Sequence, residues 1–226
     1  MSRTLFLGIL IYYMIAFIML EIASLHSKWK KYRIYAKTAA SLGFVVMALI
    51  AGRTCSAQEY AKCMSAGFGL CMVGDIQLAM TGANGIKQYM KEGLISFLMG
   101  HILFVVGLYK LGTFSPYSLL FPIFYVGLLV VLVRRLRIHL GKMKYPVMIY
   151  VFFVSLLFST GLFTWIGMEQ AAGALLILSG TAFFIISDTL LFFLYFYHGA
   201  KHRLQFTETL TYYLAQMLLA CSLLVI

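Results

Sequence analysis

Gly67-Phe-Gly-Leu-Cys-Met-Val-Gly-Asp-Ile-Gln-Leu78 sets the architecture of this chain, because it places one carboxylate, Asp75, in a run otherwise apolar enough to cross a bilayer. An aspartate at the bilayer centre costs roughly 2.5 to 3.5 kcal/mol, so it is expected to face a bundle interior or a water-filled cavity. The stretch from Gly180 to Leu191 repeats the pattern, with Asp188 in the place of Asp75. These two aspartates are the first candidates for a functional site.

The composition is that of an integral membrane protein. Hydrophobic residues make up 62% of the 226 residues and charged residues 11%, against about 25% charged residues in soluble domains. Apolar runs long enough for a helix to cross the hydrocarbon core alternate with short polar joints, whereas a transmembrane barrel would show shorter alternating segments. We therefore expect an all-α protein, a single domain over residues 1–226, with eight transmembrane helices at 5–25, 34–52, 63–83, 93–112, 114–133, 146–166, 171–195 and 207–226.

Positive charge is unevenly divided between the two sides of these predicted helices. The first and fifth joints carry five Lys or Arg residues each and the third and seventh carry two each, while the opposite side has Arg3, Arg53, Lys62 and Lys110. The positive-inside rule predicts that the odd joints are cytoplasmic and that both termini are outside. Anionic lipid headgroups are the natural partners of these cations, so the net charge of +11 does not indicate a nucleic-acid partner. We expect a multi-pass protein of the cell (plasma) membrane if the source is bacterial.

The predicted topology gives Asp75 and Asp188 a common depth. Both predicted helices run from outside to inside, and each aspartate lies about 11–12 Å from the cytoplasmic end of its helix. The two carboxyls are therefore expected within about 10 Å of each other, the usual range of two-carboxylate sites. Because the aspartates are half a chain apart, the pattern also suggests a parallel internal repeat of four helices, although small residues and Leu are common enough in such helices to match by chance.

Further polar residues gather in the same cytoplasmic half: Lys37, His101, Tyr150, Gln216 and Glu21. A one-sided set favours a pocket open to the cytoplasm or inner leaflet over a pore, which needs a polar lining along its full length. Each residue also has a purely structural interpretation: the aspartates could pair with Lys37 or bond a neighbouring helix, His101 and Gln216 could link helices, and Tyr150 could belong to an interfacial belt.

Small residues accompany both aspartates. Gly67 and Gly180 share a helix face with the aspartates and are expected to let neighbouring helices approach closely. The residues directly before the carboxyls, Gly74 and Ser187, leave room for a neighbour or a substrate. The predicted site thus has Asp75 and Asp188 as catalytic residues and, as positioning or substrate-binding residues, Lys37, His101, Tyr150, Gln216 and Ser187.

Neither a metal nor an organic cofactor is expected. Only His101 lies deep in a predicted helix, while His26, His139, His198 and His202 fall in or next to joints, so a three-histidine zinc site is hard to assemble. An Asp/Asp/His metal site stays an alternative. The cysteines lack metal-binding spacing and are interpreted as packing residues, with a Cys55–Cys63 disulfide as the alternative.

The ordered motifs resemble the YhhN-type lysoplasmalogenases, eight-helix membrane proteins that include alkenyl ether hydrolases. The resemblance covers nearly the whole chain and is carried by Gly67 through Gly74-Asp75 to Leu78, Gly93 with Phe97 and His101, Pro146-Val147 with Tyr150, Gly180 through Ser187-Asp188 to Leu191, and Tyr212-Tyr213 with Ala215-Gln216. The chain departs from the family pattern at Thr38, Gln77 and Phe104, where Pro, an apolar residue and Tyr are frequent. The last two departures put the identity of the substrate in doubt.

The resemblance implies hydrolysis of the vinyl ether bond of a lysoplasmenyl phospholipid to a fatty aldehyde and a glycerophospho-alcohol. Vinyl ethers hydrolyse by protonation at carbon, so the chemistry needs one protonated carboxyl and one carboxylate, as in glycosidases. Asp75 and Asp188 would fill these roles in an order that the sequence leaves open, with Lys37 binding the phosphate. The rival interpretations are a proton-coupled transporter or lipid-handling protein that uses the aspartates as proton carriers, and a scaffold in which they only join helices. No oligomeric state is indicated.

Overall fold

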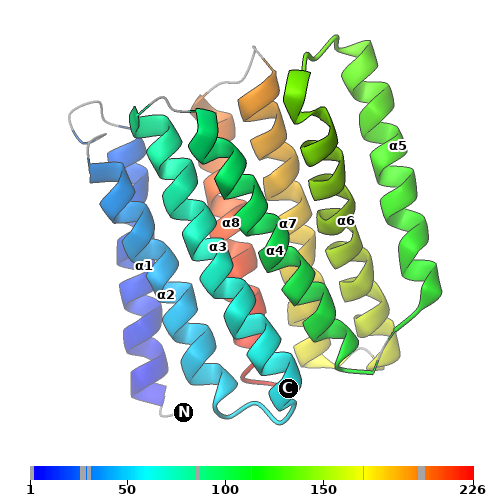
Figure 1. The fold of residues 1–226 in the computed structure, drawn as a ribbon. Coiled ribbons are helices and arrows are strands. Elements are labelled where there is room, and N and C mark those ends of the chain that lie inside the picture. Colours follow the sequence, from blue (N-terminus) through cyan, green and yellow to red (C-terminus); the bar gives the residue numbers. More distant parts are fainter. Residues whose placement is uncertain are drawn as a thin grey trace. The chain divides into compact units, whose positions relative to one another are not determined.

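A computed structural model describes the chain apart from residues 1–2, 26–28, 30–31, 85–86, 113, 170 and 198–201 (Figure 1). The described residues contain no strand and form eight α-helices, α1 (Arg3–Leu25), α2 (Arg33–Gly52), α3 (Gln58–Asn84), α4 (Lys87–Tyr109), α5 (Leu120–Arg135), α6 (Lys144–Gly167), α7 (Ala172–Phe196) and α8 (His202–Ser222), with the 3-10 turns η2 (Pro116–Leu119) and η3 (Gly141–Met143). The all-α prediction is confirmed for these residues.

Seven of these helices, α1 to α7, are long and apolar enough to cross a membrane. This finding supports a multi-pass membrane protein. An eighth crossing by α8, the outside location of the termini and the internal repeat stay predictions. His26, His198 and the predicted joint cations Lys28, Lys30, Lys31 and Lys201 lie outside the described residues.

Several helix ends differ from the predicted ones. α3 begins at Gln58 instead of residue 63, and α4 begins at Lys87 instead of residue 93. A helix satisfies its own backbone hydrogen bonds, so it can continue into polar residues beyond an apolar run. α5 begins at Leu120 instead of residue 114, because Pro116 opens the 3-10 turn η2 before the α-helix starts.

One compact unit comprises Met1–Gly107 together with Leu223–Ile226. Its helices α1 to α4 run alternately up and down (Figure 1), and α2 packs against both α1 and α3. The aromatic core joins Phe68 to Phe44 and Phe104, with ring centroids 5.8 and 5.1 Å apart. The C-terminal segment is tied to this unit by the backbone N–H of Ser56, which donates to the carbonyl of Ile226 over 3.3 Å.

The helices α3 and α4 meet along glycines. A Cβ atom added at Gly67 would lie 2.5 Å from the Phe104 ring and 3.1 Å from the Gly100 carbonyl oxygen. Gly100 in turn lies against Cys71. The predicted close approach at Gly67 is confirmed. Cys55 and Cys63 are free thiols, so the alternative disulfide between them is not formed.

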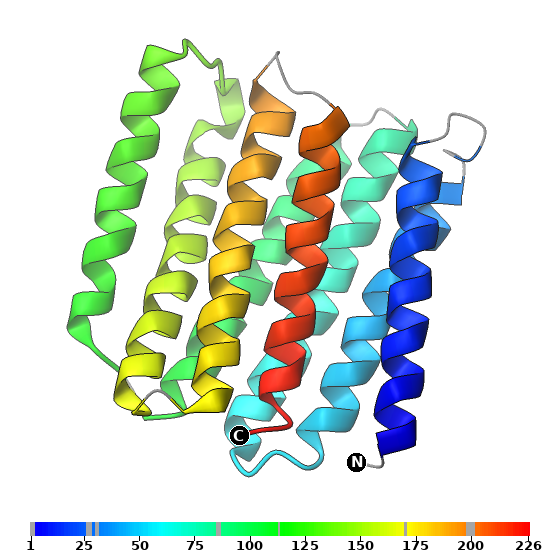
Figure 2. The same ribbon diagram turned by 180° about the vertical axis from the view of Figure 1, so that it is seen from behind.

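The second compact unit comprises Leu108–Ser222 and contains α5 to α8. Here α6 packs against α5 and α7, and α7 packs against α8, an arrangement seen from behind in Figure 2. A Cβ atom at Gly180 would lie 2.8 Å from Leu219 and 3.2 Å from the Ala215 carbonyl oxygen on α8. The predicted close approach at Gly180 is therefore confirmed as well.

Candidate active site

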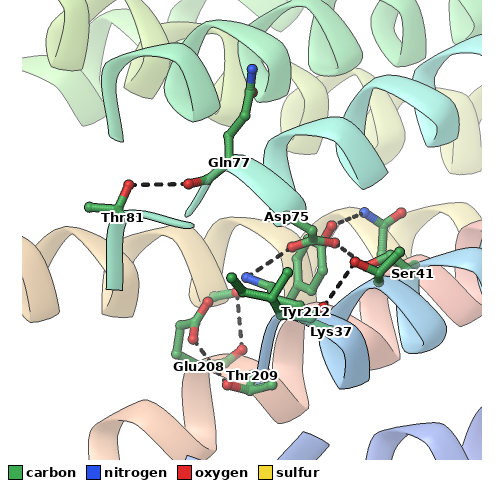
Figure 3. A network of polar contacts seen from close by, with 12 residues as sticks. Lys37, Ser41, Asp75, Gln77, Thr81, Glu208, Thr209 and Tyr212 are labelled. Carbon is green, nitrogen blue, oxygen red and sulfur yellow. Dashed lines mark hydrogen bonds and ion pairs between the residues drawn. The ribbon is translucent and has the colours of Figure 1, made fainter. Parts of the chain in front are cut away.

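Asp75 lies on α3 with its side chain 1% exposed, and both of its carboxyl oxygens are bonded from α2. Lys37 Nζ lies 3.0 Å from Oδ1, and Ser41 Oγ donates a 2.6 Å hydrogen bond to Oδ2. Lys37 and Ser41 are four residues apart, so they stand on one face of α2. Figure 3 shows both side chains directed at the carboxyl. The pairing of Asp75 with Lys37, one of the alternatives open from the sequence, is observed.

This hydrogen-bond pattern is that of a carboxylate. A carboxylic acid must donate from one oxygen, whereas an ionised carboxyl only accepts. The Lys37 ammonium can only donate, and Ser41 donates to the other oxygen. Lys37 and Ser41 thus both act as donors to the Asp75 carboxyl, and the Lys37 ammonium, which was expected to bind the phosphate, lies against this carboxyl.

The helix α4 supplies aromatic neighbours on the same unit. A Cβ atom at Gly74 would lie 2.6 Å from the Phe97 ring, so this ring fills the room that the glycine leaves beside Asp75. His101, with 0% of its surface exposed, lies one turn after Phe97, and its ring is perpendicular to that of Phe104 at 6.4 Å. His101 is thus enclosed in an aromatic setting within the first unit.

Asp188 belongs to the second unit, where it faces a small cavity walled by α5, α6 and α7. The cavity measures about 20 Å³ and is lined by Tyr125, Leu129, Tyr150, Val151, Val154, Ile185, Asp188, Thr189 and Phe192. This volume is about what one water molecule needs. The structure therefore brings the predicted residues Tyr150 and Asp188 to one cavity whose other lining residues are mostly apolar.

Two hydroxyl groups of this cavity form a directed chain. Thr189 Oγ1 donates to the carbonyl oxygen of Ile185 over 2.5 Å, and it lies 2.6 Å from the Tyr125 hydroxyl. Because the threonine has one hydroxyl proton and uses it on the carbonyl, Tyr125 must donate to Thr189. The tyrosine oxygen then keeps acceptor capacity toward a group that enters beside Asp188.

Ser187 and Gln216 have mainly structural contacts. Ser187 Oγ donates to the backbone carbonyl of Glu208 over 3.1 Å and so ties α7 to α8. Gln216 Nε2 lies 2.9 Å from the Tyr212 hydroxyl, one turn earlier in α8. Ser187 therefore joins two helices, and the room expected beside the carboxyl stays a prediction. Glu208 also accepts a hydrogen bond from Thr209 (Figure 3).

Three residues of these two clusters were not foreseen: Ser41, Tyr125 and Thr189. Ser41 could have been found as the hydroxyl one turn after Lys37, and Thr189 as the residue after Asp188. Tyr125 gives no signal in the sequence, because it lies 63 residues before Asp188.

Asp75 and Asp188 belong to different units. The expectation that their carboxyls lie within about 10 Å of each other therefore stays a prediction. The described residues include no group of three or more His, Cys, Asp or Glu side chains suited to a metal ion.

Comparison with known proteins gives one match. Neither the curated proteins nor the solved structures contain a match to this chain. The model of the YhhN family, however, matches residues 32–223, which include every residue of both clusters. The chain therefore belongs to the YhhN family.

Proposed function

We propose that this protein hydrolyses the vinyl ether bond of lysoplasmenyl phospholipids, releasing a fatty aldehyde and a glycerophospho-alcohol. Membership of the YhhN family and seven helices apolar enough to cross a membrane are consistent with a membrane enzyme acting on lipid. The observation that carries the proposal is a carboxyl of a predicted membrane-spanning helix at a small cavity. Asp188 lines a cavity of about one water molecule together with Tyr125 and Tyr150, while Lys37 and Ser41 hold the second carboxyl, that of Asp75.

The reaction needs a proton at carbon and a water molecule. Protonation of the outer vinyl carbon leaves an oxocarbenium ion on the ether carbon. Water then adds to that ion, and the resulting hemiacetal loses the glycerol oxygen as an alcohol, so that one water is consumed for each aldehyde formed. General acid catalysis of such a step is commonly worth a factor of about 10² to 10⁴.

The surroundings of the two carboxyls support one division of the roles that the sequence left open. Lys37 and Ser41 donate to the Asp75 carboxyl, so Asp75 stays ionised in this proposal and Asp188 is the proton donor. Tyr150 and Tyr125 line the Asp188 cavity, where their hydroxyls can orient the carboxyl or the water. The joint action of both aspartates is supported by the sequence, in which they occupy matching places in the third and seventh helices.

The decisive measurement is product analysis with purified protein and a lysoplasmenyl lipid. In D₂O the released aldehyde should carry one deuterium on the carbon next to the carbonyl, because that carbon takes the proton. A saturated alkyl ether analogue should give no product. Asp188→Asn should lose aldehyde formation by a factor of about 10² or more while keeping its melting temperature.

Wild-type rates for both Asp188→Asn and Asp75→Asn would reject the proposal. The transporter interpretation predicts a different result, namely uptake of a solute into proteoliposomes driven by a pH gradient, with no aldehyde formed. The scaffold interpretation predicts that both substitutions lower the melting temperature and that no lipid is cleaved.

A further inference from the structure

A second cavity lies between α5 and α6, two of the three helices that wall the Asp188 cavity. It measures about 240 Å³ and is lined by Val130, Val133, Arg134, Ile138, Leu140, Gly141, Lys144 and Met148. Apolar side chains form most of its wall, and two exposed cations, Arg134 and Lys144, stand on it. An apolar cavity with cations of this kind suits an amphiphile with an anionic head.

The Lys and Arg residues of the segment that borders this cavity have no acidic residue among them. Residues 134–144 include Arg134, Arg135, Arg137, Lys142 and Lys144 and no Asp or Glu. Arginine binds phosphate oxygens through a planar fork of donors, and lysine binds them as a point charge. A phosphate is therefore the group that this cavity fits.

The two cavities are joined along shared helix faces. On α5, Tyr125 and Leu129 line the Asp188 cavity, and Val133, four residues further on, lines the second cavity. On α6, Lys144 and Met148 line the second cavity, and Val151, on the same face, lines the first. A molecule lying along α5 and α6 would thus touch both cavities.

The spacing between the cavities matches a lysoplasmenyl lipid. Along α6, Lys144 precedes Tyr150 by six residues, or about 9 Å, and along α5, Arg134 follows Leu129 by five residues, or about 7.5 Å. In the lipid, seven covalent bonds separate the phosphorus from the vinyl carbon that takes the proton, which is roughly 8 Å in an extended chain. A phosphate at Arg134 and Lys144 would therefore place that carbon at the depth of the Asp188 cavity.

We infer that Arg134 and Lys144 bind the phosphate of the lysolipid and hold its vinyl ether at the Asp188 cavity. This inference builds on the proposed function, and it gives the phosphate a site other than Lys37, whose ammonium lies against Asp75. Substrate enters with its chain along the apolar wall between α5 and α6. Because the distance between the two cavities matches the distance from phosphorus to vinyl carbon, the site suits a substrate with a glycerol backbone between phosphate and vinyl ether.

The test compares two double variants that remove the same charge from the same joint. Arg134→Gln/Lys144→Gln removes both cations of the cavity, and Arg135→Gln/Lys142→Gln is the control, because neither of its residues lines the cavity. All four side chains are exposed, so folding should be kept, which the melting temperature checks. The cavity variant should raise KM for lysoplasmenyl lipid about tenfold or more with kcat retained, and the control should change KM less than about threefold.

A phosphate-free substrate sharpens the comparison. The cavity variant and the wild type should cleave a 1-alkenyl glycerol with equal KM, because the lost cations then have no partner. A penalty that persists without the phosphate, or equal effects of the two double variants, would overturn the inference. Displacement of the lysolipid by equimolar inorganic phosphate would also overturn it, by indicating a site for soluble anions.

Binding of a saturated alkyl ether lysophospholipid separates this inference from the proposed function. One outcome is that the cavity variant binds this ligand about tenfold more weakly than the control while the wild type forms no aldehyde from lysoplasmenyl lipid. In that case the phosphate site stands and the proposed reaction fails. If aldehyde forms and both double variants bind equally, the reaction stands and the phosphate site fails.

Discussion

Lys37 Nζ lies 3.0 Å from Asp75 Oδ1, and their side chains are 13% and 1% exposed. An ion pair this deep is held by mutual neutralisation, because each charge alone would be poorly solvated. The pair joins α2 to α3 and, with Ser41, gives the Asp75 carboxylate a fixed set of donors. Its consequences for stability can be measured without any assay of function.

Replacing Lys37 by Met should strongly destabilise the protein. The substitution leaves the buried Asp75 carboxylate without its ammonium partner, a change that costs about 3–5 kcal/mol in comparable buried pairs. Asp75→Asn in the same chain should recover most of the loss, because the uncompensated charge is then gone. Unfolding in mixed detergent micelles measures both variants.

The matched control for Lys37 is Lys62, which pairs with Glu59 at 2.8 Å but with side chains 70% and 64% exposed. Lys62→Met should leave the unfolding midpoint unchanged, since exposed pairs are screened by solvent. If Lys37→Met were as harmless as Lys62→Met, the buried pair would not be a stabilising contact.

Ser41→Ala should lower the free energy of unfolding by about 1.5–3 kcal/mol, the usual worth of a hydrogen bond to a charged group. Its 2.6 Å bond to Asp75 Oδ2 spans two helices. Thr38 serves as the control on the same helix, because its hydroxyl donates to the Ile34 carbonyl one turn back and so within α2. Thr38→Ala should therefore change stability far less, and equal losses would contradict the role given to Ser41.

The sequence predicted the helices and the glycine contacts well, since both depend on local signals. Apolar runs of about 20 residues mark helices in a bilayer, and glycines at helical spacing mark close packing. It predicted the helix starts less well, because the bounds at Gln58 and Lys87 depend on continued hydrogen bonding beyond the apolar run.

The candidate site was predicted only in part. Lys37 and Asp75 stand out as rare charges in apolar runs, and their pairing was one of the stated alternatives. Tyr125 and the directed bond to Thr189 could not be predicted, because tyrosines are common in such helices and side-chain pairing across α5 and α7 depends on helix rotation. The shared depth of the two aspartates remains a prediction.

Gly67→Ala tests the packing of α3 on α4. The added Cβ would lie 2.5 Å from the Phe104 ring and 3.1 Å from a backbone oxygen of α4, so overpacking should cost about 1–3 kcal/mol. An added Cβ at Gly69, on the same helix, would meet no side chain and no other helix within 4 Å among the described residues. Gly69→Ala should be neutral or stabilising by up to about 1 kcal/mol through helix propensity. A harmless Gly67→Ala would show that the helices can separate at this point without loss.

Tyr150→Phe tests whether the Asp188 cavity is the place of the chemistry. Tyr150 is 5% exposed and lines that cavity beside Asp188, so loss of its hydroxyl should lower kcat for vinyl ether cleavage about tenfold or more if it orients the carboxyl or the water. KM should change little, because the ring and its packing are kept. Tyr145, on the same helix and 73% exposed, is the control, and Tyr145→Phe should leave kcat unchanged. Equal kcat values for the two variants and the wild type would show that the Tyr150 hydroxyl orients neither the carboxyl nor the water.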